Sequence, residues 1–319
     1  MTGPTGPSGH APGPEGIRCS HVSRQVQEPL AGTAPRADVW VAVEHVPGWG
    51  DATLTRSGHG VRVLMARGPR TPPQPGSASV AVTVGPSGWV DHSRGGASTT
   101  GVRVWVGHCA PTPTLRVGRV ESATAVTDWD LADIAAGSLR DWGRDDPDPL
   151  LLVCANGRRD RCCGHSGGRL ADALWRGPHA DRVLTCTHLG GHRFAPTALL
   201  LPVGALHGRL DATSATALLG DAGHGEMAAG TLRGHSVLDE PAQVAEAHAR
   251  AVTGHRGLAP LPVALAPSDD PDRMHAHVRG WDPRDVQRPL EVQLLRSRST
   301  ALQSCGREPE PTTRWTISP

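Results

Sequence analysis

Residues 150–154 read LLLVC, and this continuously apolar run decides the expected fold. A strand that is covered on both faces of a parallel sheet carries such a run. Residues 168–175 have the pattern of a helix, and Val183-Leu184-Thr185 has that of a second strand. A strand, a crossover helix and a strand in this order form a right-handed parallel βαβ unit.

The segments after this unit extend it. Residues 198–201 and 206–210 predict a hairpin around Val203-Gly204, and Asp211 is placed to cap a helix that runs to about Leu219. The order βαβ, connecting loop, ββα is that of a thioredoxin-like core. We therefore predict an α/β fold in which residues 146–230 form this core.

The region before the core is predicted in two parts. Residues 1–36 are rich in Gly and Pro, and we expect a largely disordered tail. Residues 37–145 are expected to be β-rich and to end with a helix over residues 127–142. One face of this helix carries Leu131, Ile134 and Leu139, and the strand-like runs are residues 39–43, 61–65, 80–84 and 102–106.

The region after the core, residues 231–319, predicts a helix followed by strands. The helix spans residues 241–252 and has Pro at its first position, where the missing N–H costs nothing. The strand-like runs are residues 276–278 and 290–294.

Composition excludes several classes of partner. The formal net charge is +1 and no basic stripe occurs, so neither nucleic acid nor an anionic membrane is expected to bind. No secretion signal and no run of about eighteen apolar residues is present, so we expect neither export nor membrane insertion. The seven cysteines are an odd, unevenly spaced set, which favours a reducing, cytoplasmic compartment in which thiols pack or bind metal.

Two unusual loops follow the two parallel strands of the predicted unit. Residues 154–163 read CANGRRDRCC and residues 186–194 read CTHLGGHRF. Ligands of parallel sheets gather at the carboxyl ends of the strands, and the Gly190-Gly191 pair allows a tight turn. Taken alone, the two histidines are typical of a polar loop, but the cysteine loop beside them favours a metal site. The four candidate ligands are Cys154, Cys163, His188 and His192.

Two thiolates and two neutral imidazoles suit either tetrahedral zinc or a [2Fe-2S] cluster. Structural zinc sites usually pair cysteines two to four residues apart. Here eight residues separate Cys154 from Cys163, which favours the larger two-iron cluster and leaves zinc as the alternative.

The pattern Cys154-x8-Cys163, with Arg159-Asp160 inside it and HLGGHRFA at residues 188–195, closely resembles the sucrase/ferredoxin-like family. The resemblance runs from about Cys19 to Leu210, with a weaker echo at residues 304–306. Its N-terminal part rests on EPLAGTA at residues 28–34, WVAVEH at 40–45 and GWG at 48–50.

This resemblance implies a thioredoxin-like ferredoxin in which the family's Cys, Cys, His, His set holds a [2Fe-2S] cluster. His188-x3-His192 stands where such ferredoxins otherwise carry a second Cys-x3-Cys pair. Cys162 competes with Cys163 for the second thiolate position, and the family spacing favours Cys163. Arg159, Asp160, Gly190, Gly191 and Cys162 are expected to surround the cluster.

The ligand set has an electrochemical consequence. Two thiolates neutralise the formal charge of the diferric core, so reduction is expected at a higher potential than in four-cysteine ferredoxins, as in Rieske centres. By the same analogy, the cysteines bind one iron and the histidines the other. The remote nitrogen of a bound imidazole keeps a titratable proton, so reduction is expected to take up a proton.

We therefore predict a cytoplasmic electron carrier, more a component of a redox system than a stand-alone enzyme, with redox donor and acceptor proteins that the sequence does not name. It is not expected to be a sucrase, because no carboxylate pair stands out for glycoside chemistry. The alternatives are a structural Cys2His2 zinc protein and a thioredoxin-like thiol oxidoreductase, although the latter lacks a Cys-x-x-Cys motif. Cys186 is expected to be a buried inert thiol, and Cys19, Cys109 and Cys305 have no assigned role.

Overall fold

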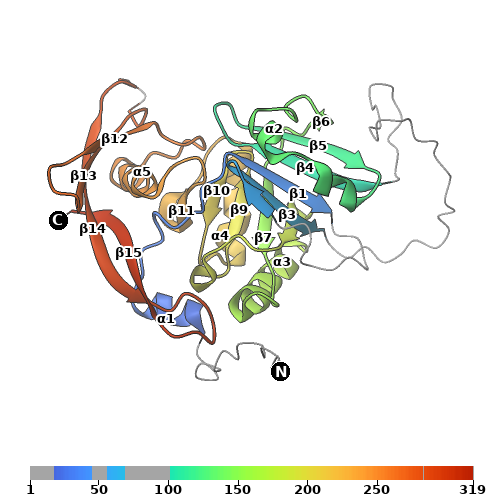
Figure 1. The fold of residues 1–319 in the computed structure, drawn as a ribbon, viewed down its shortest axis with the longest axis horizontal. Helices are drawn as coiled ribbons and strands as arrows, with labels where there is room; N and C mark the ends of the chain where they lie inside the picture. The colour runs from blue at the N-terminus through green and yellow to red at the C-terminus, as the bar shows by residue number, and fades with distance from the viewer. Residues whose placement is uncertain (1–17, 45–55, 69–100, 283, 319) are drawn as a thin grey trace, which may run out of the picture.

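The computed structural model describes residues 18–44, 56–68, 101–282 and 284–318, which form two β-sheets with helices packed against them (Figure 1). Within these residues, the larger sheet is mixed and has eleven strands in the order β11-β10-β9-β7-β8-β3-β1-β4-β5-β6, with β2 paired to β3. The smaller sheet is antiparallel, in the order β12-β13-β14-β15. The prediction of an α/β fold is confirmed.

The order of elements predicted for the core is present in the larger sheet. β7 and β8 are parallel neighbours joined by α3, and β9 runs antiparallel to β7 before the turn into β10. Asp211 caps α4 through a hydrogen bond at 2.7 Å from the backbone N–H of Ser214, as predicted. These elements are β7 (Leu150–Cys154), α3 (Gly168–Leu174), β8 (Val183–Cys186), β9 (Ala198–Leu201), β10 (Ala205–His207) and α4 (Ala212–Gly223). A further strand, β11 (Leu232–His235), which the sequence did not predict, pairs with β10.

The burial of β7 explains its apolar sequence. All five of its residues are buried, and they alternate between two packed layers. Leu151 and Val153 pack with the apolar residues of α3 and α4, whereas Leu150, Leu152 and Cys154 belong to the core on the opposite face. The strand therefore ends with a sulfur atom directed away from the two helices.

The N-terminal strands continue the same sheet. β3 pairs antiparallel with β8 through Ala66 and Cys186, so the strands before the core are not separated from it. Three predicted strands are confirmed, whereas residues 80–84 and 48–50 lie outside the described residues. The strands are β1 (Val39–Glu44), β2 (Arg56–Gly58), β3 (Val61–Arg67), β4 (Val102–His108), β5 (Thr114–Val120) and β6 (Arg144–Asp145).

The helix predicted over residues 127–142 is wrong in its extent. A 3₁₀ helix, Ala123–Asp128, comes first, and α2 (Leu131–Ala135) has only five residues. Asp130 caps α2, and the chain leaves the helix at Gly137, whose φ of 100° is incompatible with an α-helix. Ile134 and Leu139 are buried all the same. The spacing of apolar residues therefore predicts correctly which side chains are buried, but it overestimates the length of the helix.

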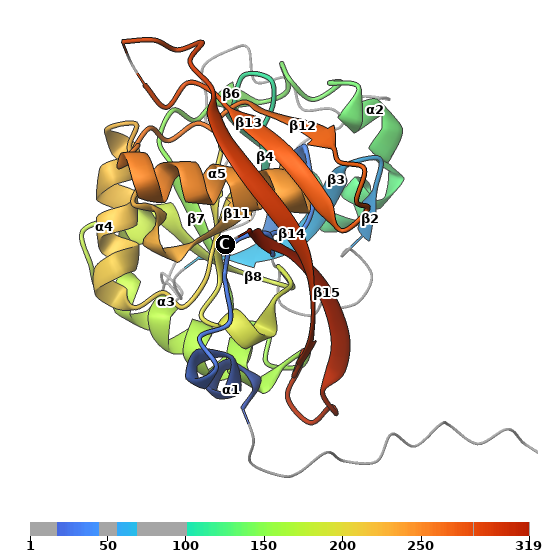
Figure 2. The ribbon, with the colours of Figure 1, turned by 90° about the vertical axis from the view of Figure 1, so that its left-hand side faces the viewer.

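The C-terminal region forms α5, as predicted, and a four-stranded sheet, in which the predicted runs 276–278 and 290–294 lie in β13 and β14. α5 (Glu240–Thr253) lies between β11 and the antiparallel sheet and packs against both (Figure 2). Apolar residues of α5, including Val244 and Ala249, share a core with Val292 and Trp315. The strands are β12 (Val263–Pro267), β13 (Arg273–Val278), β14 (Leu290–Ala301) and β15 (Glu310–Ile317).

A short helix, α1 (Cys19–Gln25), lies within the segment predicted as a largely disordered tail. Residues 1–17 are outside the described part, but Cys19 and Ser23 of α1 are buried. The helix packs against residues 192–194, and the far end of the β14–β15 hairpin reaches it (Figure 1). Because so short a helix is held by tertiary contacts and not by its own propensity, its sequence gave no periodic signal.

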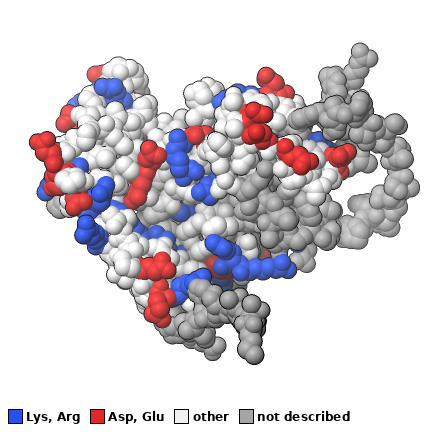
Figure 3. Space-filling model, in the orientation of Figure 1, with Lys and Arg blue, Asp and Glu red and all other residues white. Residues whose placement is uncertain are grey.

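The described helices include none that is long and apolar enough to cross a lipid bilayer. Acidic and basic side chains are interspersed over the face seen in Figure 3. This mixture agrees with the near-zero net charge of the sequence.

Candidate metal centre

The carboxyl ends of β7 and β8 lie side by side and position the two loops. Cys154, the last residue of β7, is in register with Cys186, the last residue of β8. The backbone N–H of Cys154 donates to the carbonyl oxygen of Thr197 at 2.9 Å, so the approach to β9 holds the same end from the other side. Both candidate loops therefore leave the sheet at one edge.

The cysteine loop turns tightly before it enters α3. The side-chain oxygen of Asn156 accepts hydrogen bonds at 3.2 Å from the backbone N–H groups two and three residues later. A π-helical turn, Cys163–Gly167, then leads into α3. A Cβ atom at Gly167 would lie 2.0 Å from the carbonyl oxygen of Cys154, so only glycine permits this close approach.

The histidine loop turns through its two glycines. Gly190 and Gly191 have φ angles of 78° and 72°, in the left-handed region that favours glycine. A 3₁₀ turn, His192–Phe194, follows at once. This geometry is the tight turn expected from the sequence, and it brings both imidazoles to one side.

The four predicted ligands approach one another in pairs. Among the described residues, Cys163 and His192 form with Asp160 a group whose ligand atoms all lie within 4.8 Å of one another, and Cys154 and His188 lie outside that group. The Cys163 sulfur is 3.3 Å from Nδ1 of His192, and the imidazole rings of His188 and His192 are 4.6 Å apart between centroids. The thiols of Cys154 and Cys163 are hydrogen-bonded to each other. Nδ1 of His188 is buried and has no hydrogen-bond partner among the described residues. A buried nitrogen without a partner is costly unless something absent from the protein chain binds it.

At three of the four predicted ligands, the local electrostatics favour the protonation state that metal binding needs. Burial, followed by the positive charges around it, lowers the pKa of His188 to about 4, and burial lowers the pKa of His192 as well. Both imidazoles are therefore neutral near pH 7. The hydrogen bond from Cys163 lowers the pKa of Cys154 to about 7 despite burial, whereas the same bond raises the pKa of Cys163. Neutral imidazoles and an ionised thiol at Cys154 are donor states of metal sites, whereas Cys163 has to lose its proton when a metal binds.

The comparison with known families decides the relationship. The model of the sucrase/ferredoxin-like family matches residues 75–234, half of the chain, and this range contains both loops of the site. The chain belongs to the sucrase/ferredoxin-like family. No curated protein and no solved structure matches the chain. The family assignment made from the two loops is thereby confirmed.

The structure of this sucrase/ferredoxin-like protein also shows a buried cation that the sequence did not reveal. Arg233 of β11 is 1% exposed, and its guanidinium donates to the backbone oxygen of Gly190 at 3.1 Å and to the hydroxyl of Thr33 at 3.0 Å. It lies 5.5 Å from the centre of the Phe194 ring. Burial lowers the pKa of Arg233 to about 9, and the nearby cysteines Cys154 and Cys163 partly oppose that shift. The guanidinium therefore stays charged beside the thiols at neutral pH.

The five residues expected to surround the cluster lie in different places. Gly190 and Gly191 form the turn that places the histidines, whereas the Arg159 side chain is exposed. Cys162, which competed with Cys163 in the sequence interpretation, contacts a different set of thiols; its sulfur is 3.2 Å from that of Cys305. Asp160 is close both to the predicted ligands Cys163 and His192 and to the thiols around Cys162.

Two remaining cysteines are packed in the core of this sucrase/ferredoxin-like protein. Cys186 is buried, and burial together with the nearby Cys154 raises the pKa of its thiol, which agrees with the inert role expected for it. Cys109 is 1% exposed and packs against Gly204, and burial raises its pKa to about 12. Both serve as matched controls for cysteines with a chemical role.

Proposed function

We propose that this sucrase/ferredoxin-like protein carries single electrons on a [2Fe-2S] cluster held by Cys154, Cys163, His188 and His192, in a thioredoxin-like core. The observation that supports the proposal is the contact between Cys163 and His192, with the His188 ring beside that of His192. The 3.3 Å contact between the Cys163 sulfur and Nδ1 of His192, and the partnerless Nδ1 of His188, both fit donors that face a common centre. Two sulfurs and two imidazole nitrogens are the donor set of a Rieske-type cluster.

When bound, the cluster supplies the site that accepts and releases the electron. The residues of the chain set the conditions for this exchange. Cys154 and Cys163 contribute two negative charges, and the buried Arg233 adds a positive charge that favours the reduced state. In His192, Nδ1 faces Cys163, so Nε2 is the nitrogen that keeps a proton and takes part in its uptake.

Burial weighs against the thiol oxidoreductase alternative. Cys154 and Cys163 are each 1% exposed, whereas a catalytic thiolate has to meet its substrate. Cys162 is also buried and is in contact with Cys305. A metal centre uses buried thiols directly.

Metal analysis with two cysteine variants tests the proposal. Anaerobically purified wild-type protein is expected to contain about two irons and two sulfides per chain and to give an electron paramagnetic resonance signal when reduced by one electron. Cys163→Ser is expected to lose most of this iron, because it removes one of the two sulfur ligands. Cys186→Ser is the matched control, since it removes a buried thiol from the neighbouring strand end and is expected to keep the cluster.

Two outcomes would contradict the proposal. A colourless protein whose only metal is zinc, bound by two sulfurs and two imidazoles, would support the structural zinc alternative. Equal loss of iron in Cys163→Ser and Cys186→Ser would show that the four-residue ligand set is wrong.

A further inference from the structure

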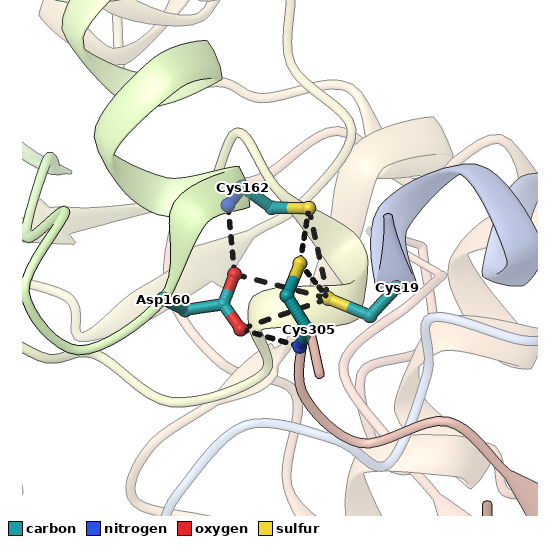
Figure 4. Close-up of side chains that lie close together, drawn as sticks. All are labelled: Cys19, Asp160, Cys162 and Cys305. Atoms are coloured by element: carbon teal, nitrogen blue, oxygen red, sulfur yellow. Dashed lines mark hydrogen bonds between the residues drawn. The ribbon is translucent and has the colours of Figure 1, made fainter. Parts of the chain in front are cut away.

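Three cysteines from distant parts of the chain meet beside the proposed cluster site. Cys19 opens α1, Cys162 lies in the cysteine loop, and Cys305 lies in the connection between β14 and β15 (Figure 4). Their sulfurs are separated by 3.7 Å between Cys19 and Cys162, 3.2 Å between Cys162 and Cys305, and 3.6 Å between Cys305 and Cys19. The sulfurs therefore form a nearly equilateral triangle.

These spacings fit a single tetrahedral metal ion. Two sulfurs that bind one zinc ion at about 2.3 Å with tetrahedral angles lie about 3.8 Å apart. A disulfide instead draws two sulfurs to about 2.05 Å and leaves the third alone. The shortest of the three observed separations, 3.2 Å between Cys162 and Cys305, is well beyond a disulfide bond, and the other two are close to the spacing expected around one ion.

The carboxylate of Asp160 supplies a fourth donor group beside the three sulfurs. The two oxygens of Asp160 lie 3.8 Å and 3.9 Å from the Cys19 sulfur, close to the value of about 3.5 Å for an oxygen and a sulfur on one zinc ion. All four donor groups lie within 4.8 Å of one another. Three sulfurs and one oxygen therefore account for a complete tetrahedral set.

The surroundings of Asp160 hold it in place without neutralising it. Its carboxylate accepts hydrogen bonds from the backbone N–H groups of Cys162 at 2.8 Å and Cys305 at 2.9 Å, and from the Ser304 hydroxyl at 2.7 Å. These donors are all neutral, and Asp160 is only 4% exposed. The Ser20 hydroxyl donates to the Cys162 sulfur at 3.2 Å. A buried carboxylate that is fixed by neutral donors and faces three thiols is a place where a cation is stabilising.

We propose that Cys19, Cys162, Cys305 and Asp160 bind one zinc ion in a closed structural site, separate from the [2Fe-2S] site. Soft thiolate donors in tetrahedral arrangement select zinc over magnesium or calcium. Cys162 and Cys163, adjacent in the chain, then serve different centres. The ion ties α1 and the β14–β15 connection to the loop that carries Cys163, which links both ends of the described chain to the electron-transfer site.

Zinc analysis together with X-ray absorption at the zinc edge tests this proposal on the full-length protein. Wild-type protein purified from medium supplemented with zinc is expected to hold about one zinc ion per chain with three sulfur neighbours at about 2.3 Å and one oxygen at about 2.0 Å. Because the measurement is specific for zinc, iron in the same sample does not interfere.

Variants assign the ligands. Cys305→Ser and Cys19→Ser are each expected to lower the zinc content at least several-fold while the iron and sulfide contents stay near those of the wild type. Cys109→Ser is the matched control, because Cys109 is a buried thiol in a different part of the core and its replacement is expected to leave both metals unchanged. Because Cys19 and Cys305 lie in distant parts of the sequence, a folding defect in one variant does not explain zinc loss in both.

Three results would overturn the zinc site. The first is wild-type protein without zinc in which mass spectrometry finds a disulfide between Cys162 and Cys305. The second is zinc retained in both variants, and the third is zinc with two sulfur and two imidazole neighbours. Wild-type protein that holds zinc on three sulfurs but contains no iron or sulfide would refute only the [2Fe-2S] proposal. The two proposals can therefore be refuted independently.

Discussion

Phe194, the only phenylalanine of the chain, shows at the level of single residues how the candidate site is charged. It is fully buried, and three guanidinium groups lie over its ring: Arg193 at 4.4 Å, Arg233 at 5.5 Å and Arg209 at 5.6 Å. Arg193 is paired with Glu28 at 2.8 Å, whereas the guanidinium of Arg233 binds backbone and hydroxyl oxygens. Arg233 is therefore the cation whose field acts on the thiols.

Replacing Arg233 is expected to lower the reduction potential of the cluster. Removing a positive charge destabilises the reduced, more negative state, and an interaction of about 1 kcal/mol corresponds to about 40 mV for one electron. We expect Arg233→Met to shift the potential downward by at least this order, measured by redox titration. Arg233→Lys keeps the charge and is the control. Equal potentials in wild type and Arg233→Met would show that Arg233 is a packing residue only.

At the level of elements, β10 carries a buried titratable group that the function does not use. His207 is fully buried, and its Nδ1 is 2.9 Å from the Thr231 hydroxyl. Burial, and then the nearby charges of His235, Arg233 and Arg250, lower its pKa to about 3. The strand therefore holds a neutral histidine in a place where a charged one is excluded.

This histidine makes the stability of the fold depend on pH. Unfolded His207 has a pKa of about 6.5, so between that pH and about 3 the unfolded state binds a proton that the folded state does not. The stability contributed by the neutral imidazole is thus present above about pH 6.5 and is lost as the pH falls, by about 1.4 kcal/mol per pH unit.

Chemical denaturation at several pH values measures this dependence. His207→Gln is expected to have a flatter decline of the unfolding free energy than the wild type between pH 6.5 and the acid limit of folding, because glutamine does not titrate. If both proteins lose stability with the same slope, the pKa of His207 is not displaced in the folded protein.

At the level of the whole molecule, the sequence predicts what is encoded locally. The run LLLVC marks the buried strand, and the family spacing identifies the two loops, because a few neighbouring residues carry each signal. The second set of thiols has no local spacing of this kind beyond the weak family echo at residues 304–306. Cys19 and Cys162 are 143 positions apart in the sequence, and so are Cys162 and Cys305. Only the folded chain brings them together.

Other misses have the same physical origin. Arg233 reaches the histidine loop from β11, and no local pattern announces an arginine that is buried by tertiary packing. The helix over residues 127–142 was overestimated because apolar spacing does not show that Gly137 adopts a positive φ. Helix α1 was missed because its contacts with residues 192–194 and not its own sequence stabilise it.

The central claim is that two histidines bind the redox centre, and the pH dependence of the reduction potential in wild type and His192→Cys tests it most directly. The account predicts that the wild-type potential falls as pH rises, by up to about 59 mV per pH unit where one proton accompanies one electron. His192→Cys is expected to retain a cluster, at a lower potential and with a flatter pH profile. In this variant a third thiolate replaces a neutral imidazole whose remote nitrogen carries a titratable proton. Identical potentials and identical slopes in the two proteins would contradict imidazole ligation.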